Sequence, residues 1–473
     1  MTVSKIYAGG RLRRLREERG LYQADLAKIL KISPSYLNQM EHDTRPLTVP
    51  VLLRLTESFG LDPEFFSERD ASRLLADLRE TLADELDRAL LSPADLKDLT
   101  GRMPHMAALL LDLGRKNRAL TERLAELTGS RGGTAAPDRA RTPHEEIREF
   151  FYRRRNYLHD ADCAAEDLAY EIGLRPGEVR RALATRLDEH HGVRITTDAD
   201  DRLHRYDPRA RIFHLSPRLR PGQQAFRMAT QIALLEHDDL IRAYASEDYE
   251  EGTTTWSLAR IGVAHHFAAA LILPYRVFHA AAEESRYDIE RLADRFGLGY
   301  ETICHRLSTL QRPRLRGVPF SFVRVDRAGN MSKRQSATGF HFSRAGGTCP
   351  LWNVYEAFAA PGRIHVQVAA MPDGQRYLWT ARTVTRHGGG WGAPGKTFAI
   401  GLGCEIRHAS RLAYSEGLDL DNRAAATPIG MGCRACERLD CTQRAMPPVG
   451  RTLAVDENTG GFVPYAVKDD RTG

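Results

Sequence analysis

The sequence lacks the features that would place it in a membrane or outside the cell. It contains no run of roughly eighteen apolar residues, the length that a spanning helix needs. The first residues, MTVSKIYAGG, lack the apolar stretch of a secretory signal. The chain also lacks a strong excess of charge of either sign, because 68 basic and 62 acidic residues leave a net charge of +6 over 473 residues. We therefore expect a cytoplasmic chain of several domains with no membrane partner.

Cysteine is scarce as well, and its seven copies are unevenly placed. An odd number without an export signal argues against a disulfide framework and favours reduced thiols. Four of them fall in the last seventy residues, as Cys404 and then Cys433, Cys436 and Cys441. The C-x2-C-x4-C spacing lets one short loop present three sulfurs to a metal centre, with Cys404 as the fourth ligand. The spacing leaves zinc and an iron–sulfur cluster open as alternatives.

Composition and periodicity divide the chain into a mainly α-helical N-terminal half and an α+β sensor half. The low apolar content of GSRGGTAAPDRARTP marks a linker, and FSFVRV and RIHVQVAAM are typical of strands. A further strand is expected at Arg211–Leu215. The predicted segments are a helical bundle at 1–66, a helical dimerisation segment at 67–128, the flexible linker at 129–143, a mixed domain at 144–312, and a C-terminal sensor domain with the cysteines at 313–473.

A seven-residue repeat occurs within the second segment. Its members alternate steps of four and three: Met106, Leu110, Leu113, Asn117, Leu120, Leu124 and Leu127. Asn117 falls on a position where a buried amide pairs with its symmetry mate and fixes a two-stranded register. This predicts a homodimer, with the core face of an ordinary bundle helix as the alternative.

The segment QADLAKILKISPSYLNQMEH has the apolar spacing of a helix-turn-helix. Small Ala27 lets two helices cross closely, and Ile32 fills the turn. Ser33 and Pro34 cap and begin the second helix. Lys31 stands at a turn position that is often glycine, so either its φ is positive or the turn differs.

Polar side chains on the second helix could read DNA. Gln39 can contact an adenine with both ends of its amide, and Arg45 follows the helix, where it can bind the phosphate backbone. The predicted DNA-binding set is Gln23, Ser33, Ser35, Tyr36, Asn38, Gln39 and Arg45. At RLRRLREERGLYQADLAKIL and SPSYLNQMEHDTRPLTVPVLLRL the chain resembles the XRE (Cro/C1-type repressor) helix-turn-helix family, which implies binding to a double-stranded DNA operator.

The stretches FAAALILP and YDIERLADRFGLGYETICHRLSTL resemble the ImmA/IrrE metallopeptidase-like domain. Active members of that family carry H-E-x-x-H on one helix, which binds zinc. Here Gln231, Ile232 and Leu235 stand at the corresponding positions, and none of them can complete that site. The resemblance therefore implies a degenerate domain, and we expect no enzymatic activity.

From QRPRLRGVPFSFVRV to the cysteine motif that ends in QRAMPP, the chain resembles the short-chain fatty acyl transcriptional regulators. The resemblance implies a short-chain acyl-CoA effector, and one type within the family carries a [4Fe-4S] cluster, which favours that cofactor over zinc. The predicted ligand-binding residues are Lys333, Arg334 and Arg344, cations close to Gly346 and Gly347. A solvated strand face would carry similar charges.

Together these features predict a DNA-binding transcriptional regulator that senses short-chain acyl-CoA and, through the cluster, redox state. Two alternatives stay open at this point. One is a DNA-binding protein with a catalytic domain of the peptidase or thiol type, and the other is a zinc-stabilised regulator with another ligand.

Overall fold

The computed structural model describes residues 9–467, except 20, 43, 60–68, 83–92, 105, 115, 118–141, 198–201, 339, 341–348, 387–394, 434–435 and 449–451. Its contacts divide the chain into two compact units. One comprises Met1–Ala135 and Arg444–Gly473, and the other comprises Ala136–Gln443. The sequence-based division placed residues 444–473 in the sensor domain, whereas here their contacts group them with the N-terminal unit.

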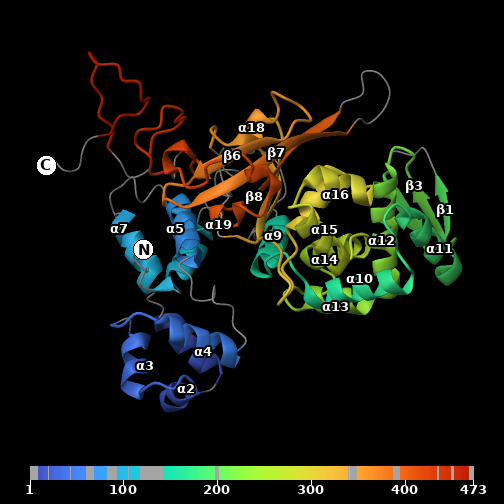
Figure 1. Cartoon of the computed structure of the whole chain (residues 1–473), viewed down its shortest axis with the longest axis horizontal. Coiled ribbons are helices and arrows are strands. Elements are labelled where there is room, and N and C mark those ends of the chain that lie inside the picture. Colours follow the sequence, from blue (N-terminus) through green and yellow to red (C-terminus); the bar gives the residue numbers. More distant parts are fainter. Residues whose placement is uncertain are drawn as a thin grey trace, which may run out of the picture. The chain divides into compact units, whose positions relative to one another are not determined.

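The N-terminal unit begins with four helices around one apolar core (Figure 1), namely α1 (Gly9–Glu18), α2 (Gln23–Ile29), α3 (Pro34–Glu41) and α4 (Val49–Phe59). The apolar residues that predicted the helix-turn-helix form this core, since Leu26, Leu30, Leu37 and Met40 are buried. Lys31 has φ of 50°, so the turn keeps its usual shape. The hydroxyl of Ser33 accepts a hydrogen bond from the Tyr36 amide at 3.1 Å and caps α3.

A second core lies farther along this unit, between α5 (Arg69–Thr81), α7 (Pro93–Arg102) and the helical residues 106–114. Ala107 and Leu111 are buried in it against Leu78. The seam residues Met106 and Leu113 instead lie on the other face, 54% and 52% exposed. Asn117 is exposed too, and residues 120, 124 and 127 lie outside the described residues. Leu110, also a member of the repeat, packs partly against this core, so the described part of the repeat is divided between the core and the exposed face.

The second unit contains a large helical layer. Its helices are α9 (Pro143–Arg153), α10 (His159–Glu171), α11 (Val179–His191), α12 (Pro221–Glu236), α13 (Asp238–Ser246), α14 (Thr254–Ile272), α15 (Tyr275–Glu284), α16 (Ile289–Phe296) and α17 (Tyr300–Leu307). Eleven residues of α14 are buried, which makes it the central helix. Among the described helices none is by itself long and apolar enough to cross a membrane, and only the pair α14 and α15, bent by 63°, passes that test together.

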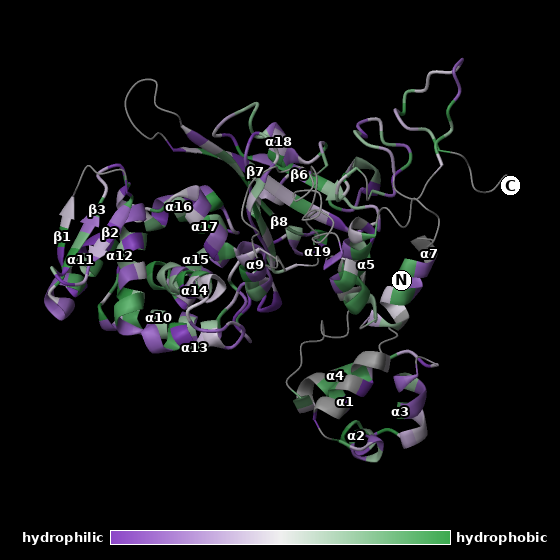
Figure 2. Cartoon of the chain, turned by 180° about the vertical axis from the view of Figure 1, so that it is seen from behind, coloured by the Kyte–Doolittle hydropathy of each residue, from purple (hydrophilic) through white to green (hydrophobic). Residues whose placement is uncertain are grey.

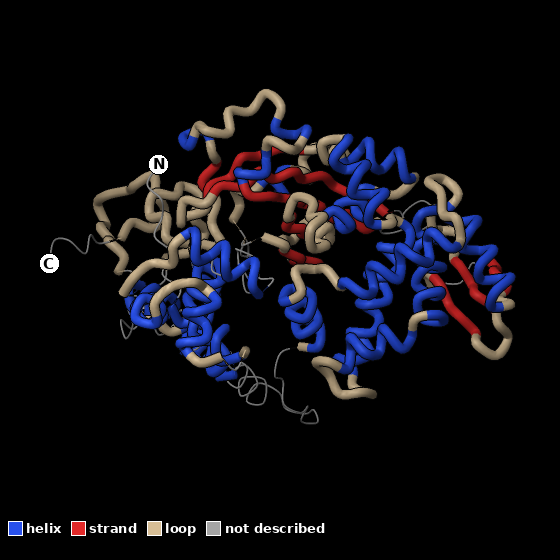
Figure 3. Tube along the Cα trace, turned by 60° about the horizontal axis from the view of Figure 1, so that its bottom comes forward, coloured by secondary structure: helices blue, strands red, loops and turns tan. Residues whose placement is uncertain are grey.

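A three-stranded sheet of order β1-β3-β2 adjoins these helices. It contains β1 (Arg194–Thr197), β2 (His204–Asp207) and β3 (Ile212–Leu215). Strand β3 lies where the sequence predicted one. Figure 3 shows this sheet and the larger sheet as two separate red groups with helices between them.

The larger sheet has six strands in the order β5-β4-β8-β7-β6-β9. Its strands are β4 (Phe320–Val325), β5 (Met331–Ser336), β6 (His365–Ala370), β7 (Arg376–Arg386), β8 (Lys396–Glu405) and β9 (Thr427–Pro428), accompanied by the short helices α18 (Asn353–Glu356), α19 (Ile406–Ala409), η2 (Ala413–Ser415) and η3 (Arg423–Ala425). Neighbouring strands are antiparallel except β6 and β9. The hydropathy colouring in Figure 2 shows hydrophobic segments in this sheet and in the surrounding helices.

The two faces of this sheet belong to different cores. Phe322, Ile400 and Leu402 pack into the core of the helical layer. Trp379 and Val323 lie in a second core on the opposite face. Two glycines of β8 make room for that second core. A Cβ at Gly403 would lie 2.4 Å from the Trp379 ring, and one at Gly401 would lie 2.7 Å from Val323.

Candidate functional site

The reading helix α3 presents the predicted polar residues on its outer side. Ser35, Asn38 and Arg45 are exposed, and Tyr36 and Gln39 are half-buried. The Arg45 guanidinium lies over the Tyr36 ring at 5.3 Å, so these two side chains form one surface. The Ser33 hydroxyl is used as the helix cap. This arrangement leaves base-reading and backbone-binding groups side by side, as a helix in the major groove requires.

Gln23 has an internal role that the sequence did not reveal. Its amide nitrogen donates to Glu41 at 2.9 Å and to Asn38 at 3.1 Å. Glu41 is buried and also accepts from Arg16 of α1 at 2.7 Å. Glu41 thus joins α1, α2 and α3, and Gln23 orients Asn38 on the reading face.

A cavity of about 1900 Å³ lies within the second unit, between the helical layer and the large sheet. Its volume exceeds the roughly 300–1,000 Å³ of pockets for drug-sized ligands. Three carboxylates line it: Glu290, Asp294 and Glu301. Ten cationic side chains also line it: Arg148, Arg218, Arg220, Arg227, Arg324, Lys333, Arg334, Arg382, Arg386 and Lys396. The lining is therefore strongly positive and suits an anionic ligand.

Arg227 and Lys333 are cations of this lining whose burial is offset by no counter-ion within the described part of the chain. The carboxylate of Glu301 pairs with Arg324 at 2.8 Å and with Arg386 at 2.6 Å. Arg227 and Lys333 make neither an ion pair nor a hydrogen bond with described residues. Burial, together with nearby Arg386, lowers the pKa of Arg227. Burial also lowers the pKa of Lys333, to about 8. Both groups carry a desolvation cost that a bound anion would offset.

Three of the four histidines that line the cavity are neutral at pH 7, because burial lowers the pKa of each. Burial, with Arg227 and Lys333 nearby, lowers the pKa of His265 to about 3. Burial also lowers the pKa of His305 well below its usual value. The pKa of His266 falls to about 4, mainly through burial. The tandem His265 and His266 thus lie in the pocket wall and in the core, and neither adds charge to the cavity at neutral pH.

The predicted ligand-binding residues do not share one site. Lys333 pairs across the strands with Arg324, on the cavity face of the sheet. Arg334 pairs with Val323, whose side chain lies in the core on the opposite face of the sheet. The Cβ of Arg334 therefore points to that opposite face, although the residue borders the cavity. Arg344 lies outside the described residues. Of the three, Lys333 is the residue that the strand register directs into the cavity, and its role in ligand binding stays a prediction.

A buried ionic network supports the helical wall of the cavity. Asp162 accepts hydrogen bonds from Arg306 at 2.6 Å and from Arg312 at 2.9 Å. Arg312 also donates to Glu166 at 2.6 Å. Burial alone would raise the pKa of Asp162, but the two arginines and His266 lower it overall. The network ties α10 to the segment that leads into the large sheet.

Helix α12 carries the positions at which the metallopeptidase-like family binds zinc. Ile232 is fully buried in the core, and Leu235 packs partly against it. Gln231 is half-buried. The neighbouring helices α16 and α17, whose sequence imitates a second helix-turn-helix, also pack inward, since Ile303 and Leu307 are buried. These elements serve as packing in the helical layer.

The cysteines divide between the two faces of the large sheet. Cys349 is buried in the core that contains Trp379, close enough to Cys433 and Cys436 for their charges to affect its pKa. Burial raises the pKa of Cys349, while backbone N–H groups of Gly430 and Leu351 oppose that shift. A Cβ at Gly430 would lie 2.6 Å from the Cys436 sulfur, so the backbone closes tightly around this sulfur.

The structure places Cys404 apart from the other predicted ligands. It is fully buried on β8, where its register partners are Phe320 and Leu378, in the core of the helical layer. Gly403, one residue earlier, faces Trp379 on the other side. Because successive residues of a strand point to opposite faces, Cys404 points away from Cys349 and Cys436. A fourth sulfur close to Cys433 and Cys436 is that of Cys349, which is the alternative to Cys404 as the fourth ligand. Cys441 is half-buried.

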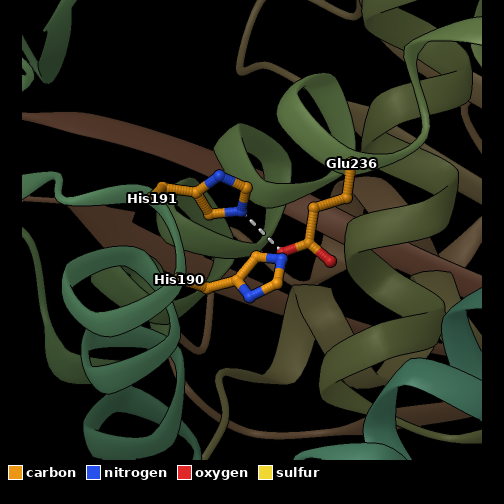
Figure 4. Close-up of side chains that lie close together, drawn as sticks. All are labelled: His190, His191 and Glu236. Atoms are coloured by element: carbon orange, nitrogen blue, oxygen red, sulfur yellow. Dashed lines mark hydrogen bonds and ion pairs between the residues drawn. The ribbon is translucent and has the colours of Figure 1, made fainter.

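A third cluster contains His190, His191 and Glu236, whose ligand atoms all lie within 4.8 Å (Figure 4). His191 Nε2 lies 2.8 Å from a Glu236 oxygen. Arg186 also donates to both oxygens of this carboxylate, at 3.0 and 2.9 Å. The ion pair with Arg186 satisfies Glu236, so the cluster needs no metal to explain it.

Known protein families match three successive parts of the chain, and similar proteins match nearly its whole length. Residues 8–66 match the family described as "Helix-turn-helix domain", 188–308 match "IrrE N-terminal-like domain", and 309–465 match "Short-chain fatty acyl coenzyme A regulator, C-terminal". The HTH-type transcriptional regulator RamB of Mycobacterium tuberculosis is 56% identical, over 98% of this chain and 100% of the relative. PrpR of the same species is 49% identical, over 98% and 96%. The propionyl-CoA carboxylase regulator of Cereibacter sphaeroides is 43% identical, over 99% and 100%. A solved structure, "Mycobacterium tuberculosis transcriptional regulator", has a TM-score of 0.67 and 51% identity, and covers 69% of this chain and 100% of that chain.

Proposed function

Since this chain belongs to the family of helix-turn-helix transcriptional regulators of short-chain fatty acyl metabolism, we propose that it regulates transcription in response to a short-chain acyl-CoA bound in the positive cavity. The relatives are named as transcriptional regulators, and one is named for propionyl-CoA carboxylase. The observation that carries the effector assignment is the pair of unpaired cations, Arg227 and Lys333, inside a cavity of about 1900 Å³.

The chemistry of the cavity suits such a ligand. An acyl-CoA carries several phosphate charges and a long, partly apolar arm that ends in a thioester. Arg227 and Lys333 offer positive charge, whereas Phe226, Phe151 and Leu258 line other parts of the wall. Arginine binds phosphate through two parallel N–H groups, and an apolar wall accepts an uncharged acyl chain.

Calorimetry of propionyl-CoA with the full-length protein tests the effector. We expect saturable binding, and Arg227→Gln should weaken it about tenfold, or ~1.4 kcal/mol, because one phosphate partner is lost. Arg209→Gln, in an exposed turn outside the cavity, is the matched control and should leave the affinity unchanged. No heat of binding to folded protein at millimolar propionyl-CoA would refute the assignment.

DNA reading by α3 is tested by comparing two side chains that have different roles. Gln39→Ala should cost roughly 1–3 kcal/mol on the specific operator and little on random DNA. Arg45→Ala should weaken both and lower the salt dependence, since its proposed partner is a phosphate. If Gln39→Ala weakened both sequences equally, the base-reading role would be lost.

We further propose a [4Fe-4S] cluster at the cysteine loop, with Cys349, Cys433, Cys436 and Cys441 as its ligands in place of the set that included Cys404. A four-thiolate set suits both iron–sulfur and zinc. Membership of the short-chain fatty acyl regulator family favours the iron–sulfur cluster, which would add redox sensitivity. An absorption spectrum of anaerobically purified protein distinguishes the two.

The exposed seam supports a homodimer, with a second copy of this chain as the partner. Met106 and Leu113 leave an apolar stripe in solvent, and Asn117 continues it. Paired reading helices would also suit a two-part operator. Leu113→Glu should shift sedimentation from dimer to monomer, whereas Ala108→Glu, which is exposed outside the seam, should not. A monomeric unaltered protein at micromolar concentration would refute this proposal.

A further inference from the structure

Lys333 has a defined position in the cavity wall. It lies on β5, at the edge of the large sheet, directly opposite Arg324 of β4. Its ammonium group lies 5.7 Å from the centre of the Phe322 ring, whose side chain is buried at the base of the same face. The register therefore directs this side chain toward the helical layer and into the cavity.

The surroundings of Lys333 leave its amine without a partner. The charged and titratable groups that line the cavity from the elements around β5 are His144 and Arg148 of α9, Arg227 of α12, His265 of α14, Glu301 and His305 of α17, and Arg324 of β4. Glu301 is the one carboxylate among them, and Arg324 and Arg386 already occupy it. His265 and His305 are neutral at pH 7, because burial lowers the pKa of each. An unpaired amine among cations and neutral rings favours its uncharged form.

We propose that Lys333 is a site of self-acylation, at which the amine accepts the acyl group of an acyl thioester bound in the same cavity. This inference rests on the proposed function, because the cavity must first bind an acyl-CoA. It adds a covalent, charge-removing modification to the reversible binding of the effector.

The step is a thioester aminolysis that balances without any other reactant. The lone pair of the neutral Lys333 Nζ attacks the thioester carbonyl carbon, a C–N bond forms, and the C–S bond breaks. CoA leaves as a thiolate and takes up the proton that the attacking nitrogen loses, so the products are Nε-acyl-lysine and free CoA thiol. The amide carries no charge, so the cavity loses one of its unpaired cations and should hold the next CoA less tightly.

Lowered basicity makes this chemistry accessible near neutral pH. Burial lowers the pKa of Lys333, and the nearby Arg324 lowers it further, whereas Glu301 raises it. The resulting pKa is about 8. An ordinary lysine has a pKa of about 10.4 and is almost wholly protonated at pH 7.5. The rate should therefore rise with pH up to about 8 and level off above it, since only the uncharged amine is a nucleophile.

The test is mass spectrometry of the full-length protein after incubation with propionyl-CoA, followed by peptide mapping. We expect one propionyl group on Lys333. Lys333→Arg keeps the positive charge but has no acylable amine, so the modification should be lost while binding of CoA persists in calorimetry. Lys97→Arg is the matched control, because Lys97 is an exposed lysine of α7 that does not line the cavity, and it should leave the modification intact.

Competition separates directed acylation from unselective chemistry. Excess CoA, which binds but has no acyl group, should suppress labelling of Lys333 in proportion to its occupancy. Labelling spread equally over surface lysines, or insensitive to excess CoA, would overturn the proposal. Binding of propionyl-CoA without labelling of Lys333 would also overturn it and leave the proposed function standing, whereas absence of any binding would refute the proposed function itself.

Discussion

The two faces of the six-stranded sheet perform different tasks although they share the same strands. The face toward the helices carries Lys333 and Arg324 and borders the positive cavity. The opposite face carries Trp379 and packs against Cys349 in a closed apolar core. Because side chains alternate along a strand, sequence neighbours such as Gly403 and Cys404 belong to different sites. The residues that form each site are therefore determined by strand parity as much as by residue type.

The sharpest test of this division compares two cysteines. Cys349→Ser should abolish the proposed iron–sulfur chromophore, because it removes a sulfur on the cluster face. Cys404→Ser should leave the chromophore intact, since its side chain lies in the helical core. Absorption spectra of both variants, purified without oxygen, provide the measurement. The opposite result would restore Cys404 as the ligand and contradict the assignment by parity.

The next largest effect is expected in the network beneath the cavity. Asp162→Asn removes the charge that pairs with Arg306 and Arg312 in the interior, which should cost about 3–5 kcal/mol of unfolding free energy. Asp167→Asn, on the exposed side of the same helix, should change stability little. Urea denaturation measures both. Equal, small effects would show that the network contributes little to the cavity wall.

Substitution of Gly403 tests how tightly the core that contains Trp379 is packed. Gly403→Ala would place a methyl group 2.4 Å from the Trp379 ring, so the aromatic core must shift. We expect a loss of about 1–3 kcal/mol in unfolding free energy. Gly299→Ala meets no atom within 4 Å and is the control. Thermal unfolding with near-ultraviolet circular dichroism should report the disturbed tryptophan in the first variant, and an unchanged signal would argue against the close packing.

The smallest expected effect is the pH dependence of ligand affinity at the cavity face. Anion binding favours the protonated form of Lys333, so affinity for CoA should be full below about pH 8 and should fall, at most about tenfold, as the pH rises from 7 to 9. Lys333→Arg should remove this dependence, because arginine stays charged. Calorimetry at several pH values provides the measurement. A flat profile in the unaltered protein would exclude Lys333 from the ligand contact.

The local features of the fold could be predicted from the sequence. The spacing of Leu26, Leu30, Leu37 and Met40 predicted the helix-turn-helix core, and the left-handed Lys31 was an expected outcome. Caps, turns and apolar spacing depend on residues within a few positions, so they can be read from a short stretch. The strand at Ile212–Leu215 was found for the same reason.

Tertiary structure alone decided the composition of the two sites. The sequence offered Cys404 and Arg334 because they lie near other cysteines and cations, but the parity of β8 and β5 turns their side chains toward other faces. It did not point to Arg227, which joins the cavity from helix α12, far from Lys333 in the sequence. The residue types determined which chemistries were available: thiolates, cations and a DNA-reading helix. Strand pairing and helix packing decided which of those groups meet, because such contacts join residues whose distance in sequence carries no information about their distance in space.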